Sequence, residues 1–309
     1  MRKFRSVLLK PLALALVVAI ALVSVIPVSA EGPNDKTGTD SGRVWPAFQI
    51  LDLTDGTVPL APRDYEAEKW YNENRAGKPI SDEEWEAGQL ALARVEAAAT
   101  SFVAPMPTLT DLPADIVTID IGDNTRRSNT TLLSANYGDD GDNAVGNAAY
   151  YHTYNIATRT NYAKVTMALQ GKPETWAYTG AYFQVTGTGS MNATIVFDGN
   201  AFGYLYAPGT PAAQWIVRAE LVDVATNTVI AYKDAYNSRV AFGGSANVGG
   251  RITSSNCSFG ATLYAGNSYF ARLVTFAIID APIPSVLNTI ANVGDSGYST
   301  YWSYIDIQW

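Results

Sequence analysis

Residues 269–280, YFARLVTFAIID, carry apolar side chains at both odd and even positions. Successive side chains of a β-strand point to opposite faces, so this segment offers apolar groups to both sides of a sheet. A strand of that kind suits burial between two layers. The stretch therefore predicts a sheet that is covered on both faces.

The residue pattern of the chain around this segment is typical of a β protein. From Ile116 onward, short runs rich in Val, Ile, Thr, Tyr and Phe alternate with clusters of Gly, Asn, Asp and Ser, giving about ten or eleven candidate strands. No amphipathic helix of useful length interrupts them, apart from a short stretch around 284–291. We therefore predict a mainly β fold, an antiparallel β-sandwich or jelly roll, over residues 114–309.

Two segments have the layout of hairpins. Residues 220–232, ELVDVATNTVIAY, place Thr226 and Asn227 at the tip between two strand-like runs. Residues 261–273, ATLYAGNSYFARL, repeat that layout around Gly266, in a turn that can take left-handed geometry. Both segments support antiparallel pairing of neighbouring strands.

The region from 44 to 113 differs in character. Residues 44–53 suggest a short strand, and start and stop signals predict a small N-terminal helical hairpin over about 64–99. In its second helix, Ser81 and Glu84 have the spacing of a capping box. A Pro-rich connector follows, up to residue 113.

The first thirty residues predict export. Basic residues at positions 2, 3, 5 and 10 precede an apolar stretch from Pro11 to about Val28, and small residues lead to a cleavage site after Ala30. Residues 1–30 are thus interpreted as a signal peptide, and 31–43 as a disordered linker. We expect a secreted protein, extracellular, at the cell surface or in the periplasm. The alternative is a retained membrane anchor, and no second apolar run of spanning length follows.

The composition narrows the range of partners. The chain has 21 basic and 29 acidic side chains, and removal of residues 1–30 leaves 17 basic side chains, a net charge of −12. An acidic chain of this kind repels phosphate backbones, so we do not expect a nucleic-acid partner. The single cysteine, Cys257, excludes an intrachain disulfide, and we interpret it as a small buried side chain. Sequons for N-glycosylation begin at Asn129, Asn192 and Asn256.

Signatures of catalysis are sparse. The only histidine, His152, has no Gly-x-Ser-x-Gly motif near it, and one histidine with one cysteine does not make a typical zinc site. In WIVRAELVDV (215–224), Glu220 and Arg218 point the same way, opposite Trp215, which suggests a salt-bridged or solvated face. A secreted carbohydrate-active enzyme of the glycosidase type, with Glu220 in a catalytic pair, stays open as an alternative.

A Gly-rich loop, NYGDDGDNAVGN (136–147), is the candidate metal site. Asp139, Asp140, Asp142 and Asn143 supply oxygen ligands of the type that calcium prefers. The spacing differs from that of an EF-hand, and the same residues are common in ordinary turns. Calcium is the only cofactor that the sequence suggests.

Aromatic residues interleaved with Asn and Thr form the candidate ligand site. They are Tyr150, Tyr151, Tyr154, Trp176 and Tyr178. Flat rings flanked by amide and hydroxyl groups suit a polysaccharide or a surface protein, although Tyr and Trp are also routine in strands and sandwich cores.

The last residues, STYWSYIDIQW (299–309), raise a separate question of placement. Alternation would put Tyr301, Ile305 and Ile307 on the core face, and Trp302 and Tyr304 on the other. We expect a strand in the middle of a sheet. Two alternatives are an outer-membrane β-barrel, whose last strand such a pattern resembles, and a filament subunit that exchanges residues 44–53 or 299–309 with a neighbour.

Taken together, the residues favour an exported, non-enzymatic, acidic β-sandwich protein. Its expected role is adhesion, carbohydrate or protein binding, or envelope structure, with self-association as a further option.

Overall fold

Strand β12 (Ser268–Asp280) is the central strand of its sheet, as its two-sided apolar pattern predicts. It pairs antiparallel with β6 (Glu174–Thr186) on one side and with β8 (Ala212–Asp223) on the other. Every residue from Tyr269 to Asp280 is buried. The computed structural model describes residues 81–105, 116–121, 129–143, 148–168, 170–282, 289–293 and 299–309, all of which belong to the unit 44–309.

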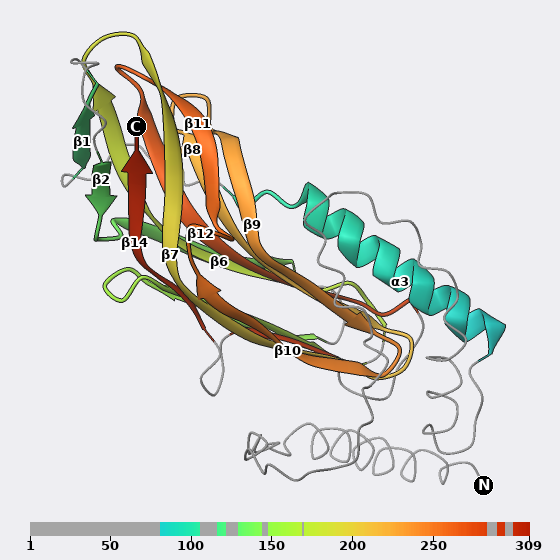
Figure 1. Cartoon of the computed structure of the whole chain (residues 1–309). Coiled ribbons are helices and arrows are strands. Elements are labelled where there is room, and N and C mark those ends of the chain that lie inside the picture. The colour runs from blue at the N-terminus through green and yellow to red at the C-terminus, as the bar shows by residue number, and fades with distance from the viewer. Residues whose placement is uncertain are drawn as a thin grey trace, which may run out of the picture. The chain divides into compact units, whose positions relative to one another are not determined.

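Sheet A contains six strands among the described residues (Figure 1). At one edge, β6 pairs with β1 (Val117–Asp120), which runs parallel to it, and with β3 (Tyr137–Asn143), which runs antiparallel. At the other edge, β9 (Thr228–Ala241) pairs antiparallel with β8.

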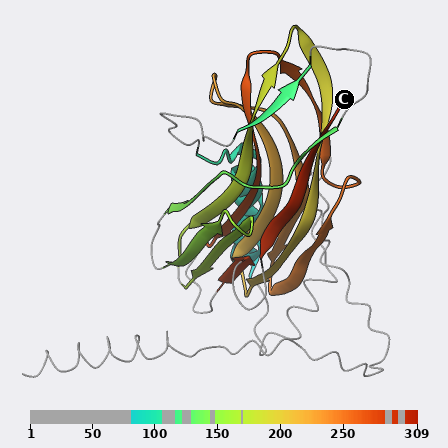
Figure 2. The same cartoon turned by 90° about the vertical axis from the view of Figure 1, so that its left-hand side faces the viewer.

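Sheet B contains eight of the described strands and is built around the long strand β7 (Ser190–Ala207). On one side of β7 lie β10 (Gly244–Ile252) and β11 (Ser258–Tyr264). On its other side lie β13 (Thr289–Val293) and β14 (Thr300–Gln308). Beyond these come β5 (Thr160–Met167), β4 (Ala148–Asn155) and β2 (Asn129–Leu132). Almost all pairings are antiparallel, and the two sheets form the facing layers of a sandwich (Figure 2).

The main core fills the space between the two sheets. Its largest side chains include Trp215, Trp302, Phe183 and Phe197, all fully buried. The Trp302 indole Nε1 in sheet B donates a hydrogen bond to Thr179 Oγ1 in sheet A, at 3.1 Å. Apolar packing is non-directional, so a directional hydrogen bond of this kind helps to fix one sheet against the other.

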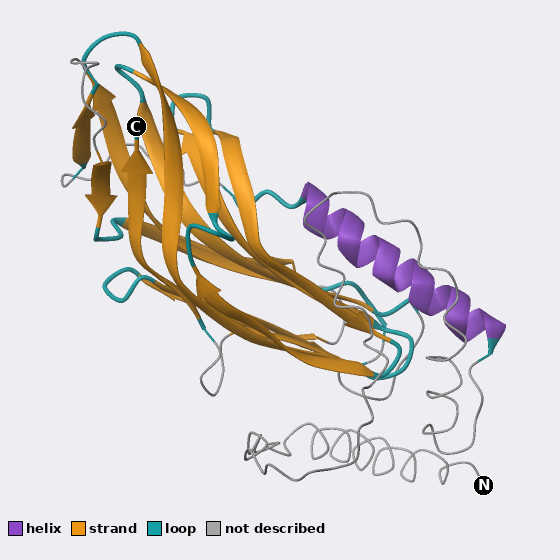
Figure 3. Ribbon diagram, viewed as in Figure 1, coloured by secondary structure: helices purple, strands orange, loops and turns teal. Residues whose placement is uncertain are grey.

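Helix α3 (Asp82–Ser101) covers the opposite face of sheet A (Figure 3). The predicted capping box is present: Ser81 Oγ accepts from the Glu84 amide, and Glu84 Oε2 accepts from the Ser81 amide. Val95 and Ala99 are buried in a second cluster with Ile216, Phe276 and their neighbours. Sheet A is therefore covered on both faces, as residues 269–280 predict. The other expected helix of the hairpin, the strand at 44–53, the linker and the signal peptide lie outside the described residues.

An ion pair is buried beneath the segment that follows the helix. Arg272 Nε and Nη2 bind Glu220 Oε2 at 2.7 and 2.6 Å, and both side chains are almost completely buried. The remaining donors of Arg272 bind the carbonyls of Ala104 and Pro105. The expected ion pair of Glu220 exists, but its partner is Arg272 from the neighbouring strand, because Arg218 binds Asp234. Of the two predicted forms, a salt-bridged or a solvated face, the salt-bridged one is present.

The expected hairpin at 220–232 is present, and the one at 261–273 is not. Strands β8 and β9 pair across a tip in which Asn227 takes a φ of 56°. The turn at Gly266 has a φ of 90°, but β11 before it joins sheet B and β12 after it joins sheet A. Because β12 is apolar on both sides, it is most stable in the middle of sheet A, and the turn carries the chain between layers.

Strand β14 lies inside sheet B, as expected, and pairs along its length with β7 of the same chain. Its facing differs from simple alternation, because the register shifts between Trp302 and Tyr304. Trp302 is consequently buried with Ile305 and Ile307, and Tyr301 lies on the outer face, so the predicted facing of Trp302 and Tyr301 is wrong. Since β14 is already paired, residues 299–309 are not a free strand in this structure.

Cys257 is free and buried, and burial raises the pKa of its thiol to about 12. The interpretation of Cys257 as a small packed side chain is confirmed. No helix within the described residues is long and apolar enough to span a bilayer.

Candidate functional site

The predicted aromatic ligand site does not form one surface. Tyr151 is 50% exposed on the outer face of sheet B, whereas Tyr150 packs against the core between the sheets. The ring of Tyr154 lies over Gly138 of β3. Trp176 and Tyr178 stack on each other on the outer face of sheet A, where Tyr178 is fully buried.

The predicted calcium ligands also separate. Alternation along β3 sends Asp140 and Asp142 to the face of sheet A that looks toward sheet B, and Asp139 and Asn143 to the opposite face. The four side chains therefore do not converge on one point. No group of acidic, histidine or cysteine side chains with metal-binding geometry occurs in the described part of the chain. Calcium binding stays a prediction.

Asp140 and Asp142 instead hold the only histidine. His152 lies on β4, at the edge of sheet B, and the two aspartates lie on β3, at the edge of sheet A. The His152 Nδ1 is 2.8 Å from Asp140 Oδ2, and its Nε2 is 2.8 Å from Asp142 Oδ2. Carboxylates only accept hydrogen bonds, so this geometry favours the doubly protonated imidazolium. Partial burial lowers the pKa of His152, but the hydrogen bonds and charges of the two carboxylates raise it, and the pKa lies above its usual value. The contact ties together the two edge strands on this side of the sandwich.

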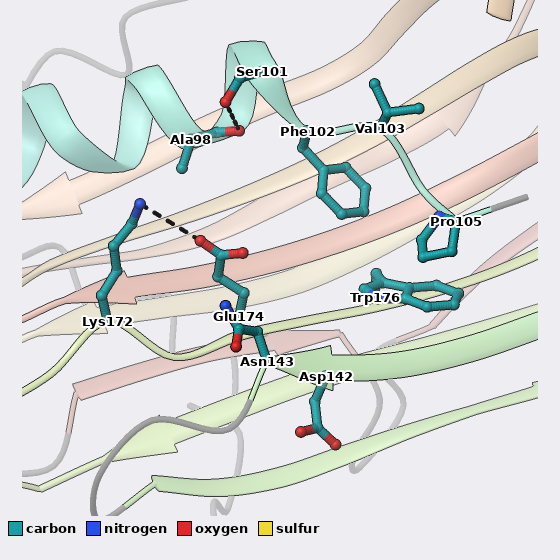
Figure 4. A pocket seen from close by; sticks show the side chains of 10 residues that line it. All are labelled: Ala98, Ser101, Phe102, Val103, Pro105, Asp142, Asn143, Lys172, Glu174 and Trp176. Carbon is teal, nitrogen blue, oxygen red and sulfur yellow. Dashed lines mark hydrogen bonds and ion pairs between the residues drawn. The ribbon is translucent and has the colours of Figure 1, made fainter. Parts of the chain in front are cut away.

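A pocket of about 370 Å³ lies between the end of α3 and the β3–β6 edge (Figure 4). Trp176 and Phe102 supply aromatic walls, and Lys172 and Glu174 form an ion pair of 3.5 Å at its rim. The other lining carboxylate, Asp142, binds His152. Both carboxylates of the described lining residues are thus engaged with basic side chains. Glu220, the candidate of the glycosidase alternative, is buried against Arg272 and out of reach of a substrate.

A second aromatic surface, outside this pocket, lies on the outer face of sheet B. No other described element covers this face. Along β7, Ala201, Gly203, Leu205 and Ala207 are buried, so the alternate residues face outward. Those outward residues are Phe202, Tyr204 and Tyr206. Phe202 is 45% exposed, and both tyrosines are partly exposed.

Strand β14 extends this aromatic row. Tyr301 lies opposite Asn200 of β7 and Tyr304 lies opposite Asp198, so both rings share the face of Phe202. The Asn200 Nδ2 donates to the Tyr301 hydroxyl at 2.6 Å. The charge of nearby Asp198, together with smaller effects of its neighbours, raises the pKa of Tyr304, which therefore stays a neutral phenol. We call Phe202, Tyr204, Tyr206, Tyr301 and Tyr304 the aromatic row.

Polar side chains flank the aromatic row. On the β10 side, register places Ser245, Asn247, Gly249 and Arg251 beside β7, and all four are exposed. On the β5 and β4 side, Tyr162, Lys164 and Tyr151 share the same face. Of the predicted ligand residues, only Tyr151 belongs to this surface. The signal that was missed is local: in NAFGYLYA (200–207), aromatic residues alternate with small or aliphatic ones.

Comparisons with known proteins give no family. No family model matches the chain, and no curated protein matches it. Among solved structures, the glycoside hydrolase domain of Endo-D from Streptococcus pneumoniae R6 matches 59% of this chain at 10% identity and a TM-score of 0.19, and the match spans 21% of that chain.

Two carbohydrate-binding modules are also similar. The CBM22-1 xylan-binding domain from Paenibacillus barcinonensis matches 52% of this chain and 96% of its own at 12% identity, with a TM-score of 0.17. The family 11 module of a Clostridium thermocellum cellulase matches 57% of this chain and 88% of its own at 10% identity, with a TM-score of 0.19. At these TM-scores the likenesses carry no weight for what this chain binds.

Proposed function

We propose that the protein is a non-enzymatic carbohydrate-binding β-sandwich and that the outer face of sheet B is its binding surface. The observation that carries the proposal is the aromatic row, five rings at successive outward positions of two paired strands. Exposed aromatic groups arranged in one contiguous patch mark interaction surfaces, whereas single exposed aromatic residues are ordinary.

The chemistry of the row suits a sugar. The faces of pyranose rings carry C–H groups that pack on flat aromatic rings, and their edges carry hydroxyls that need hydrogen-bond partners. Here the rings are bordered by amide, hydroxyl and phenol groups, which both donate and accept. Tyr supplies large contact area with few rotatable bonds, which keeps the entropy loss on binding small.

The test is binding to a glycan microarray, followed by affinity electrophoresis in gels that contain each soluble polysaccharide found. The double variant Phe202→Ala/Tyr204→Ala should lose at least about tenfold in affinity, as expected when central aromatic contacts are removed. The matched control is Tyr264→Ala, since Tyr264 is 54% exposed on the same sheet but lies far along β7 from the row.

Two results would contradict the proposal. One is a wild-type protein that binds no glycan while melting cooperatively. The other is retention of full affinity by the double variant, which would place the binding surface elsewhere. Circular dichroism of each variant checks that the sandwich is intact.

We also propose that this binding takes place outside the cell, in adhesion or envelope structure. The support is the signal-peptide pattern of residues 1–30, which lie outside the described residues. N-terminal sequencing of protein recovered from the medium or the cell surface should begin at Glu31. The jelly-roll form of the sandwich likewise stays a prediction, because several connections between the sheets lie outside the described residues.

A further inference from the structure

We infer that the aromatic row binds the interior of a linear, uncharged polysaccharide whose axis runs along β7. This inference deepens the proposed function and depends on it. It rests on three features of the outer face of sheet B: the length of the row, the balance of its charges and the lack of a wall along its β10 side.

The row is long, and it passes from β7 to the neighbouring strand β14. From Tyr206 to Asp198, β7 makes four two-residue steps, and each outward position along them presents a ring from β7 or from its partner β14. At about 3.4 Å per residue, these steps cover about 27 Å. That length exceeds a single sugar several times over, so a monosaccharide would contact only one or two of the five rings.

The charges on this face compensate each other. Asp198 is 3.5 Å from Arg251, and Asp306, on β14, accepts a hydrogen bond from Thr131 at 2.6 Å. With Lys164 on β5, the described residues of this face include two acidic and two basic side chains. The net charge of −12 that remains after removal of residues 1–30 further disfavours a polyanion. Neutral sugars fit this arrangement better than uronic acids or sulfated sugars.

Along the β7 part of the row, the described residues of β10 leave the rings open, and Arg251 lies further along, beside Asn200. The residues of β10 beside Tyr206, Tyr204 and Phe202 are Ser245, Asn247 and Gly249, all short. Gly249 has a φ of 102°, and a Cβ there would lie 2.1 Å from the carbonyl oxygen of Ala201, so only glycine fits beside Phe202. Short side chains at these three positions leave this side of the row open, so a polymer lying along β7 meets no wall beside Tyr206, Tyr204 or Phe202.

The experiment is calorimetric titration with β-1,4-linked gluco-, xylo- and manno-oligosaccharides of one to six residues, and with the matching soluble polymers. For the series that binds, we expect affinity to rise by about tenfold or more between two and five sugars and then to level off. Polymers with chemically blocked ends should bind as well as unblocked ones, and polygalacturonate should not bind.

Variants at the two ends of the row sharpen the test. Tyr206→Ala and Tyr304→Ala should each weaken the hexasaccharide by several-fold while leaving the shortest bound ligand nearly unaffected, because a short ligand occupies the central rings. Tyr264→Ala, on the same sheet, should change neither value.

The outcomes separate the two proposals. Binding with no gain beyond one or two sugars, loss of binding on blocking the chain ends, or preference for polygalacturonate would overturn this inference and leave carbohydrate binding standing. Absence of binding to every neutral sugar and polymer would overturn both.

Discussion

The ion pair between Arg272 and Glu220 should be one of the most costly contacts to break in the molecule. We consider Arg272→Met, which keeps the apolar stem and removes the guanidinium. In the wild type this group binds Glu220 at 2.6 to 2.7 Å, donates to two backbone carbonyls and lies 4.6 Å from the ring of Tyr178. The variant loses all of these interactions at once.

The magnitude follows from burial. Glu220 is 1% exposed and Arg272 is 0% exposed, so the variant leaves a carboxylate in the interior without a counter-charge. Removing one partner of a buried pair costs about 3–5 kcal/mol. The carbonyl of buried Ala104 also loses its donor, which contributes about 1 kcal/mol or more within that range.

Urea denaturation followed by tryptophan fluorescence measures the free energy of unfolding. The double variant Arg272→Met/Glu220→Leu should recover about 2 kcal/mol or more of the loss, because no buried charge remains. The matched control is Arg251→Met, whose side chain is 72% exposed and whose pairing with Asp198 should contribute less than about 1 kcal/mol. A loss below about 1 kcal/mol in Arg272→Met alone would refute the reasoning, since it would mean that water reaches Glu220.

Three further predictions concern single side chains. The pKa of His152 lies above its unfolded value of about 6.5, so its stabilising charge is fully present below that pH and is lost as the pH rises through the raised pKa. The difference in unfolding free energy between wild type and His152→Gln should therefore shrink between pH 6 and 9. A constant difference would argue against a charged His152 between Asp140 and Asp142. Ser81→Ala should lower stability by about 1 kcal/mol through loss of the cap on α3, measured in urea, with exposed Thr100→Ala as the comparison. Cys257 should not react with a thiol reagent at pH 8 in the native protein and should react fully in urea, whereas rapid native labelling would contradict its burial.

Features encoded by local patterns were predictable from the sequence. Apolar side chains on both sides of residues 269–280 indicate a strand between two layers, and β12 has sheet B on one face and α3 on the other. The spacing of Ser81 and Glu84 indicates a capping box, which is present. In both cases the energetic reason for the structure lies within a few residues of the chain.

The pairing partners of strands and side chains were harder to predict from the sequence, because they depend on residues that are distant along the chain. The turn at Gly266 was identified, but its two strands join different sheets, since the pairing of β12 is decided by burial in sheet A. No local pattern in the sequence connects His152 with Asp140, which the sequence indicates only as a metal ligand. Their contact exists only because β3 and β4 are neighbouring edges of two sheets.

The aromatic row combines a part that a local sequence pattern predicts with a part that depends on residues distant in sequence. Phe202, Tyr204 and Tyr206 alternate along one strand, so their shared face could be inferred from NAFGYLYA alone. The contributions of Tyr301 and Tyr304 could not be inferred, because they require the pairing of β14 with a strand about a hundred residues earlier and a shift of register.

That shift of register links the core to the proposed binding surface. Strict alternation would place Trp302 and Tyr304 on one face, so either the indole would be exposed or the phenol would be buried. An extra residue between the pairs Trp302–Gly199 and Tyr304–Asp198 resolves this conflict, as β-bulges do when they re-aim side chains. Gly199 is needed for the close approach, since a Cβ there would lie 2.1 Å from the carbonyl oxygen of Tyr301. Trp302 then reaches Thr179 across the core, and the strand that carries Tyr301 and Tyr304 is held by the packing of both sheets. Rings anchored in this way lose little freedom on binding, which is the physical condition for a flat surface to hold a flexible polymer.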